Sequence, residues 1–341
     1  MRSEQEALAS AEVVAGLARA VSRAWMLREP SISAERVAGE LLTFLGASDV
    51  IWQMLPGWGA SGEGVPYAQQ DEVDATLRLA EWQARHQLRR PATEPLPVWD
   101  PRVRVGLARA FAAADEEPSI RYLGFKLFLR ALLVECASPG EWTEFVRRFH
   151  LRPDEEFLAN GSPPVDAAEL LRTAARGGAM LPVLRGEAVR QAVRGGCALV
   201  GQAHLVMAMC ALEYVMLLTD TRLTDDVAAF NRGAAVLAEA GLDYLDVKDF
   251  AMDLSPGPAV VPKEEKGWRA AREDPPYGAD LFHAAGEAAR LAAELGHRHV
   301  GSTHLLFAIA SDGAGPGSRM LREHDVDPAA VAVRLGRELA P

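Results

Sequence analysis

The C-terminal segment of the chain carries the clearest helical pattern of apolar and polar positions. Apolar side chains recur between Leu281 and Leu295 at the spacing of one helical face, and Gly296 follows the last of them. Glycine can adopt the left-handed conformation that closes the last turn of a helix, so this pattern predicts a helix that ends at Gly296. After a tight turn we expect a second helix, capped by Ser302 or Thr303.

The pattern continues to the end of the chain. Leu305, Leu306 and Ile309 form the inward face of the second helix. Asp327 before Pro328 is a typical N-cap and first-turn pair, and it predicts the start of a last helix. The segment is therefore expected to fold as a helical hairpin followed by two short helices.

The signature between the first two of these helices, which we call the box, recurs upstream. Residues 201–206, Gly-Gln-Ala-His-Leu-Val, repeat the box at residues 301–306, Gly-Ser-Thr-His-Leu-Leu. Residues 237–243 likewise mirror residues 321–327. A helical repeat that cannot bury its own apolar face needs a neighbour to complete the core, so these two copies are expected to pack together.

Two more divergent copies precede them. Residues 124–129 follow a helical face between residues 103 and 114, and residues 33–37 follow another between residues 14 and 25. An extra helix is expected at residues 71–89, between these two copies. Four copies predict an all-α protein in which tandem repeats form two double-repeat lobes.

Breaks in the helical pattern predict the domain boundaries. The two lobes are expected to cover residues 1–176 and 177–341, divided at a glycine pair. Within the second lobe the repeats are expected at about 180–254 and 279–339. The linker between them, residues 255–278, is rich in proline and charge and is expected to be a surface loop.

The second-lobe signature resembles the Clp N-terminal repeat, the helical module found in tandem in front of the ATPase rings of Clp-family AAA+ unfoldases. The resemblance rests on residues 294–297, Glu-Leu-Gly-His, on the box at 301–306, and on residues 323–327, Glu-His-Asp-Val-Asp. It implies a recognition domain that receives substrates or adaptors. In some members such domains bind phosphorylated arginine or cyclic peptide antibiotics.

The resemblance also points to particular positions. In the family, an acidic residue immediately before the box histidine can meet the guanidinium of a phosphoarginine ligand. Only Glu35 keeps a carboxylate there, so we expect the standard phosphoarginine sites to be lost; Glu35 either retains one or is an exposed helix-start carboxylate. The candidate partner-binding residues are Glu35, Lys126, Ala203, His204, Thr303 and His304.

The box histidines admit two interpretations. His204 and His304 are expected to lie at helix starts and to form hydrogen bonds across the turn, a structural role. Alternatively, His304 could converge on a metal with His297 and His299, but no nearby cysteine or carboxylate completes a zinc ligand set. We therefore expect no metal.

Composition and charge exclude several classes. With 49% hydrophobic residues the chain can fill ordinary globular cores, and its net charge of -11 argues against a nucleic-acid partner. A basic run at residues 85–90 either meets an acidic protein or is a solvated helix end. The apolar run at 198–218 is interrupted by polar residues, so no membrane span is expected. Three cysteines and an N-terminus without a secretory pattern favour a cytoplasmic protein with reduced thiols.

Catalytic and cofactor motifs are absent from the sequence. There is no Gly-x-x-x-x-Gly-Lys-Ser/Thr phosphate-binding loop, so we expect no ATPase module. Residues 57–62 fit a dinucleotide-binding glycine pattern, but no βαβ context follows and no cofactor is expected. Neither a His-Glu-x-x-His nor a Gly-x-Ser-x-Gly motif occurs, so no catalytic residue is assigned.

These observations favour a non-enzymatic, stand-alone Clp-repeat protein that acts as an adaptor or regulator of a Clp-type protease by binding the Clp ATPase, its substrates, or both. A decoy that sequesters a cyclic peptide antibiotic is one alternative, and an enzyme with an unrecognised active site is another. Large aromatic residues in or beside the segments that separate the repeats within each lobe are either exposed binding anchors or buried side chains, here called staples, that hold those segments in place. They are Trp52, Trp58, Tyr67, Trp268 and Tyr277.

Overall fold

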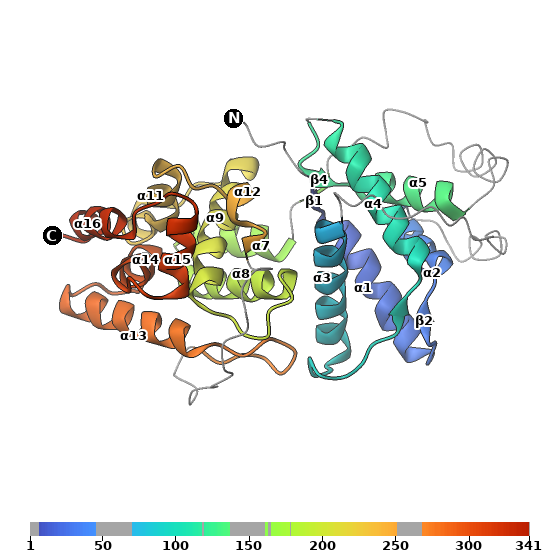
Figure 1. Cartoon of the computed structure of the whole chain (residues 1–341), viewed down its shortest axis with the longest axis horizontal. Helices are drawn as coiled ribbons and strands as arrows, with labels where there is room; N and C mark the ends of the chain where they lie inside the picture. The colour runs from blue at the N-terminus through green and yellow to red at the C-terminus, as the bar shows by residue number, and fades with distance from the viewer. Residues whose placement is uncertain are drawn as a thin grey trace. The chain divides into compact units, whose positions relative to one another are not determined.

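The computed structural model of the chain describes residues 7–45, 70–117, 119–136, 161–162, 165–177, 179–250 and 268–340. Its contacts divide the chain into two compact units, unit 1 (Met1–Pro164) and unit 2 (Val165–Pro341). Both units are built mainly of helices (Figure 1). The all-α prediction is confirmed, with strands limited to two residues each.

In unit 1, a two-residue strand precedes each of four helices, α1, α2, α4 and α5. Its elements are β1 (Leu8–Ala9), α1 (Ala11–Met26), β2 (Ser31–Ile32), α2 (Ala34–Leu42), a 3-10 turn (Thr43–Leu45), α3 (Gln70–Leu88), β3 (Val98–Trp99), α4 (Pro101–Asp115), β4 (Tyr122–Leu123) and α5 (Phe125–Cys136). The strand before α1 pairs in parallel with the strand before α5, and the strand before α2 pairs with the strand before α4. The extra helix expected at residues 71–89 is confirmed as α3.

The core of unit 1 lies between these helices. Helix α1 packs along α3 and α2, and α4 packs along α5. The side chains at their centre are fully buried, among them Leu17, Leu41, Leu107, Phe111 and Phe128. Two helix pairs joined by short parallel strands therefore close around one core.

Unit 2 is organised around one long apolar helix. Its elements are α7 (Val165–Ala174), α8 (Met180–Arg194), α9 (Gln202–Thr219), α10 (Asp225–Ala228), α11 (Gly233–Glu239), α12 (Tyr244–Val247), α13 (Ala279–Glu294), α14 (Ser302–Ser311), α15 (Pro316–Glu323) and α16 (Pro328–Leu339). Helix α9 contacts α8, α7, α15 and α11, and α14 contacts α16 and α13. The predicted helical hairpin followed by two short helices is confirmed as α13 to α16.

Helix α9 is, among the described residues, the one helix long and apolar enough to cross a membrane by length and composition alone. Of its 18 residues, 67% are buried within the structure. A central core helix passes the same test, and the contacts of α9 with its neighbours place it in the core of unit 2.

The boundary between the units differs from the expected one. The sequence predicted a division between residues 176 and 177, whereas the structure divides the chain between 164 and 165. Helix α7 accounts for the difference, because it packs on α8 and α9 and buries Leu171 and Ala174 completely or nearly so. It belongs to unit 2 although glycines follow it.

Three helices, α1, α8 and α13, end with the same turn. Arg28, Gly196 and Gly296 each take a left-handed conformation, with φ of 57°, 70° and 68°. The next N–H then bonds back to the carbonyl five residues earlier, as in Cys197 to Ala192 and His297 to Ala292, both at 2.8 Å. This is the Schellman closure. The predicted helix end at Gly296 is confirmed.

Candidate functional site

All four boxes lie where a helix begins. Ser33, Gly201 and Gly301 are the N-caps of α2, α9 and α14, and the carbonyl of Gly124 accepts the N–H of Phe128 in the first turn of α5. The first N–H groups of a helix have no partner within it, so the box must supply partners from elsewhere. How each box does so decides which side chains remain available to a ligand.

The side chain of His304 forms a hydrogen bond with the backbone of the turn that precedes its own helix. Its Nδ1 accepts the N–H of Gly301 at 3.2 Å, which places the proton of the neutral ring on Nε2. That Nε2–H points to Nδ1 of His297 at 2.9 Å, and Phe230 packs against the His297 ring at a centroid distance of 4.6 Å. Burial, together with His297, lowers the pKa of His304 to about 4. The ring is therefore neutral at pH 7.

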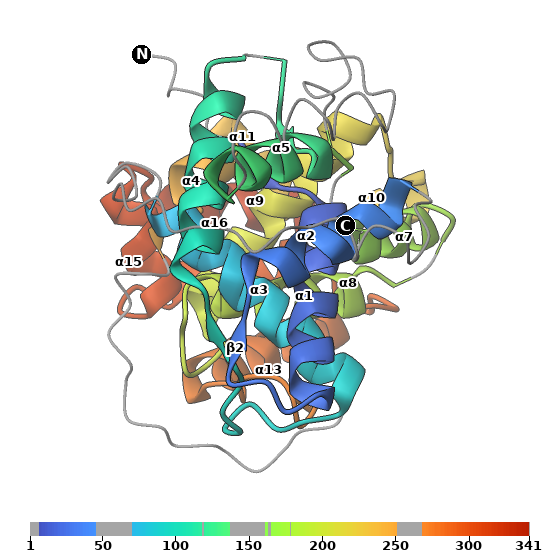
Figure 2. The same cartoon turned by 90° about the vertical axis from the view of Figure 1, so that its right-hand side faces the viewer.

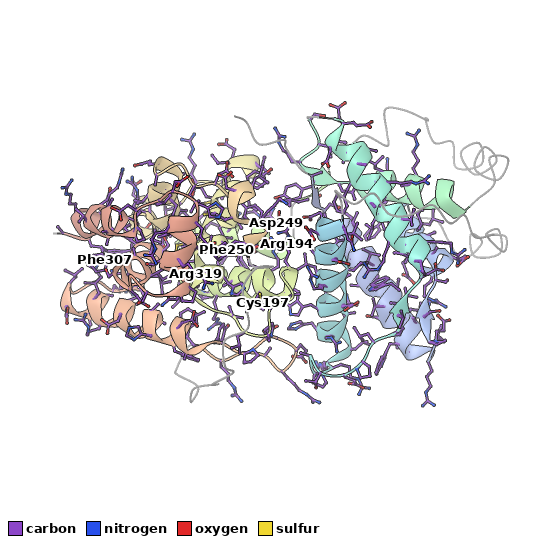
Figure 3. The ribbon with its side chains drawn as sticks, viewed as in Figure 1. Arg194, Cys197, Asp249, Phe250, Phe307 and Arg319 are labelled. Atoms are coloured by element: carbon purple, nitrogen blue, oxygen red, sulfur yellow. The ribbon has the colours of Figure 1, made fainter. Side chains whose placement is uncertain are left out.

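His204 repeats the first of these bonds. Its Nδ1 accepts the N–H of Gly201 at 2.9 Å, its side chain is 2% exposed, and burial lowers its pKa to about 4. Its Nε2, however, has no hydrogen-bond partner among the described residues. Cys197, labelled in Figure 3, holds the position that His297 holds in the other copy. The predicted structural role of both box histidines is confirmed, but only one copy completes it.

The expected cap of α14 is wrong in its details. The N-cap is Gly301, and the hydroxyls of Ser302 and Thr303 do not cap their own helix. They accept backbone N–H groups from another segment: Ser302 Oγ that of Gly233 at 3.1 Å and Thr303 Oγ1 that of Arg232 at 2.8 Å. The start of α14 is thus joined to the start of α11.

The same segment supplies the missing cap. Asn231 Oδ1 accepts the N–H of Ser302 at 2.9 Å, and the carbonyl of Phe230 accepts the N–H of Thr303 at 3.1 Å. The packing is so close that a Cβ atom at Gly301 would lie 2.0 Å from the Phe230 carbonyl oxygen. This clamp, residues 230–233 on residues 301–303, closes over the box and leaves Thr303 with no exposed surface.

Helix α9 receives its cap from α13. Asp280 Oδ2 accepts the N–H of Gln202 at 2.8 Å. The Gln202 amide in turn donates to the carbonyl of Asp280 at 3.1 Å and to the carboxylate of Asp312 at 3.0 Å. Neither Asp280 nor Asn231 was foreseen from the sequence, because each acts on a helix start more than seventy residues away along the chain.

Glu35 already meets a guanidinium of its own chain. Its half-buried carboxylate pairs with Arg102 at 3.2 Å. Arg102 also binds the carboxylate of Asp100, the N-cap of α4, at 2.5 Å. Although burial opposes it, hydrogen bonding from Arg102 lowers the pKa of Asp100. A guanidinium ligand would have to displace Arg102 from Glu35.

The structure separates the six candidate partner-binding residues into two groups. Ala203, His204, Thr303 and His304 are buried, and the last three form hydrogen bonds that hold the box turns. Glu35 and Lys126 are half-buried at the starts of α2 and α5 in unit 1. Partner binding by these residues stays a prediction, and only the second group presents accessible side chains.

The two aromatic residues of the linker at residues 255–278 are buried and pack against each other. Trp268 and Tyr277 are 6% and 4% exposed and pack edge to face at a centroid distance of 5.6 Å. Burial raises the pKa of Tyr277 to about 12. The alternative that they are exposed binding anchors is therefore wrong. Trp52, Trp58 and Tyr67 lie outside the described residues.

A buried arginine joins the end of α8 to the residues after α12. Arg194 is 2% exposed and donates to the carbonyl of Lys248 at 2.5 Å. Its guanidinium also lies 3.4 Å from the carboxylate of Asp249, beside it in Figure 3. Burying a charge is costly unless it is bonded in this way, so Arg194 fixes the end of α8 to the residues after α12. This contact is structural.

The surface of unit 2 carries a shallow hollow of about 660 Å³ along the outer face of α16. Its lining mixes charged and small apolar side chains from Asp327 to Glu338. Among the described residues, no group of three or more histidine, cysteine, aspartate or glutamate side chains is placed to hold a metal ion.

Comparison with known proteins connects this geometry to a family. Residues 231–340, about a third of the chain, match the family model of the Clp repeat (R) N-terminal domain. No curated protein matches the chain. The matched segment begins at Asn231, the residue that caps α14, and contains the His297–His304 pair and α16. The chain therefore carries, in residues 231–340, a Clp repeat N-terminal domain, a protein-interaction module of the Clp family.

Proposed function

We propose that this chain is a non-catalytic protein- or peptide-binding protein that acts in the cytoplasm as an adaptor or regulator of a Clp-type ATP-dependent protease. The observation that carries the proposal is the Clp repeat domain at residues 231–340. A domain of this family is an interaction module, and unit 1, which lies outside the matched segment, would give the chain another surface on which to bind.

The electrostatics of unit 2 support a non-catalytic role. An acid or base that works near pH 7 needs a pKa near 7 and access to a substrate. Burial lowers the pKa of His204 and His304 to about 4 and raises the pKa of the Cys210 thiol to about 12. These three groups are buried and neutral, and they are suited to packing rather than to proton transfer or nucleophilic attack.

Two units on one chain favour bridging. When one unit holds the ATPase and the other a substrate, the second contact forms at the high effective concentration set by the first. An adaptor needs this arrangement, because neither contact has to be tight by itself. The two compact units of this chain would each provide one such surface.

The proposal is tested by reconstitution. The purified full chain is mixed with the Clp-type ATPase and peptidase of the same host, and degradation of a folded fluorescent substrate is followed alongside ATP hydrolysis. We expect a direct complex on analytical size exclusion and a change of about twofold or more in either rate.

The matched variants for this assay are Gly301→Ala, which disturbs the clamp over α14, and Gly286→Ala, which meets no atom within 4 Å. Loss of the effect in the first variant and its retention in the second would assign the activity to the matched domain. A chain that neither forms a complex nor alters either rate contradicts the proposal.

A further inference from the structure

One end of unit 1 gathers the C-termini of two helices. Ser22, near the end of α1, donates to Gln87, near the end of α3, at 2.9 Å, so the two helices finish side by side. Figure 2 shows both helices descending toward β2 at this end. The residues just past the two ends, Arg28 and Arg89, are left-handed, with φ of 57° and 53°.

Large apolar side chains are exposed at this end. Met26 and Leu27, on the last turn of α1, are 65% and 58% exposed, and Val98 of β3 is 70% exposed. The N–H of Val98 bonds to the carbonyl of Pro30 at 3.1 Å, which places β3 against the chain that leaves α1. We call Met26, Leu27, Arg28, Arg89 and Val98 the end patch. Adjacent exposed apolar residues rimmed by charge are typical of interaction surfaces.

The backbone that carries the patch is held in place. The N–H of Arg90 bonds to the carbonyl of Arg85 at 2.9 Å, and the Arg85 guanidinium donates to the carbonyls of Pro91 and Glu94 at 2.8 and 2.6 Å. The turn after α3 is therefore tied to its own helix. A surface formed in advance loses little conformational entropy when it binds.

The end patch has a local excess of positive charge in a chain of net charge -11. Neighbouring carboxylates are already engaged, Glu29 with Arg36 at 2.8 Å and Glu94 with Arg90 at 3.7 Å. Arg28 and Arg89 are exposed and, within the described residues, have no ion pair. Their charges are available to carboxylates of another molecule.

Helix capping does not account for these two cations. Cations near a helix C-terminus often compensate its unpaired carbonyls. In α1, the carbonyls of Arg23, Ala24 and Trp25 already accept backbone N–H groups at 2.9 to 3.0 Å. The carbonyls of Arg85 and His86 in α3 are likewise used. Within the described residues, neither guanidinium donates a hydrogen bond to a carbonyl of these helix ends, so both groups remain available to another molecule.

We propose that the end patch binds a peptide segment of a partner protein that combines acidic side chains with apolar anchors. The apolar residues would accept the anchors, and Arg28 and Arg89 would pair with the flanking carboxylates. The inference deepens the proposed function, on which it rests, by naming the surface and the chemistry of the partner segment.

The test measures binding of the full chain to a fluorescein-labelled peptide that alternates glutamate and leucine, by fluorescence anisotropy. The double charge reversal Arg28→Glu/Arg89→Glu is expected to raise the Kd about tenfold, since two exposed ion pairs become repulsive. The apolar variant Met26→Ser/Val98→Ser is expected to weaken binding similarly. Raising the salt concentration is expected to weaken the wild-type complex.

The matched control is Arg222→Glu/Arg322→Glu, which changes the net charge equally at exposed positions of unit 2. It is expected to leave the Kd unchanged. Equal weakening by both double variants, equal binding of a lysine-for-glutamate peptide, or no binding at all overturns the proposal. So does a concentration-dependent dimer in sedimentation that the Arg28/Arg89 variant abolishes, because the occupant would then be a second copy of the chain.

The two proposals fail separately. If the peptide does not bind but the chain still changes the rate of the reconstituted Clp protease, the end patch is not the docking surface and the proposed function stands. If neither the peptide nor the protease responds, both proposals fall.

Discussion

A histidine in the first turn of a helix can serve two neighbours at once. His304 accepts a backbone N–H with one ring nitrogen and donates to His297 with the other. His204 makes only the first bond, and its Nε2–H is buried without a partner among the described residues. A buried donor left unpaired costs about 1–3 kcal/mol. The two copies of the box therefore differ at one hydrogen bond.

Replacing Cys197 with histidine should restore the missing partner. The variant Cys197→His is expected to raise the free energy of unfolding by about 1 kcal/mol, because Nε2–H of His204 gains an acceptor. The reverse change, His297→Cys, is expected to lower it by a similar amount. Urea unfolding followed by circular dichroism measures both. A destabilised Cys197→His variant would show that the two boxes are not equivalent.

The buried histidines also predict how stability depends on pH. In the unfolded chain each has the ordinary pKa of 6.5, whereas His204 and His304 have a pKa of about 4 in the folded chain. Between these values the unfolded state binds more protons, so stability is fully present above pH 6.5 and falls as the pH drops toward 4. The loss is on the order of a few kcal/mol in total.

Urea midpoints measured from pH 7.5 down to pH 4.5 test this dependence. Removing one titrating ring with His204→Gln should flatten the profile. The matched control is His283→Gln, which makes the same substitution at an exposed position of α13. A wild-type midpoint that does not fall over this interval would contradict the neutral, buried state of both rings.

At the scale of elements, the sequence predicts best what adjacent residues determine. The end of α13 was predicted from Gly296, which adopts the left-handed conformation, and Gly196 ends α8 in the same way. The first copy makes the same turn with Arg28, so no residue type signalled it. The cap of α14 was missed for another reason, because Asn231 acts on Ser302 from 71 residues away along the chain. Local patterns contain no such information.

A substitution that adds one methyl group tests the contact between the two segments of the clamp. Gly301→Ala would place a Cβ atom 2.0 Å from the carbonyl oxygen of Phe230, so the clamp must open or shift. We expect a loss of about 2–4 kcal/mol, within the range of severe packing changes. Gly286→Ala, in open space on α13, should instead stabilise by up to about 1 kcal/mol through helix propensity.

Thermal unfolding of the two alanine variants provides the comparison. They carry the same substitution in the same unit, so their difference isolates the contact with Phe230. If Gly301→Ala unfolds at the wild-type temperature, the clamp is looser than the structure shows and cannot hold the start of α14.

For the whole molecule, the structure has two compact units, and their boundary differs from the one expected from the sequence. Repeats that need a neighbour come in pairs, so four boxes predicted two lobes. The boundary was expected at Gly177 and Gly178, since glycine interrupts helices, and Gly177 does take a φ of 94°. The break after a helix nevertheless does not have to coincide with the boundary of a unit. Helix α7 turns back onto α8 and α9, and only its tertiary contacts show to which unit it belongs.

Truncation tests where unit 2 begins. The fragment 165–341 retains α7, whereas the fragment 177–341 removes Leu171, which is fully buried, and uncovers the faces of α8 and α9 beneath it. Burial of one leucine contributes about 2–3 kcal/mol, so the shorter fragment should melt about 5–10 °C lower. In the full chain, Leu171→Ala should reproduce much of this loss, while Leu170→Ala, at a position that is 40% exposed, should change little. Equal melting temperatures for the two fragments would instead place the start of unit 2 after α7, because they would mean that the helix contributes nothing to the core against which it packs.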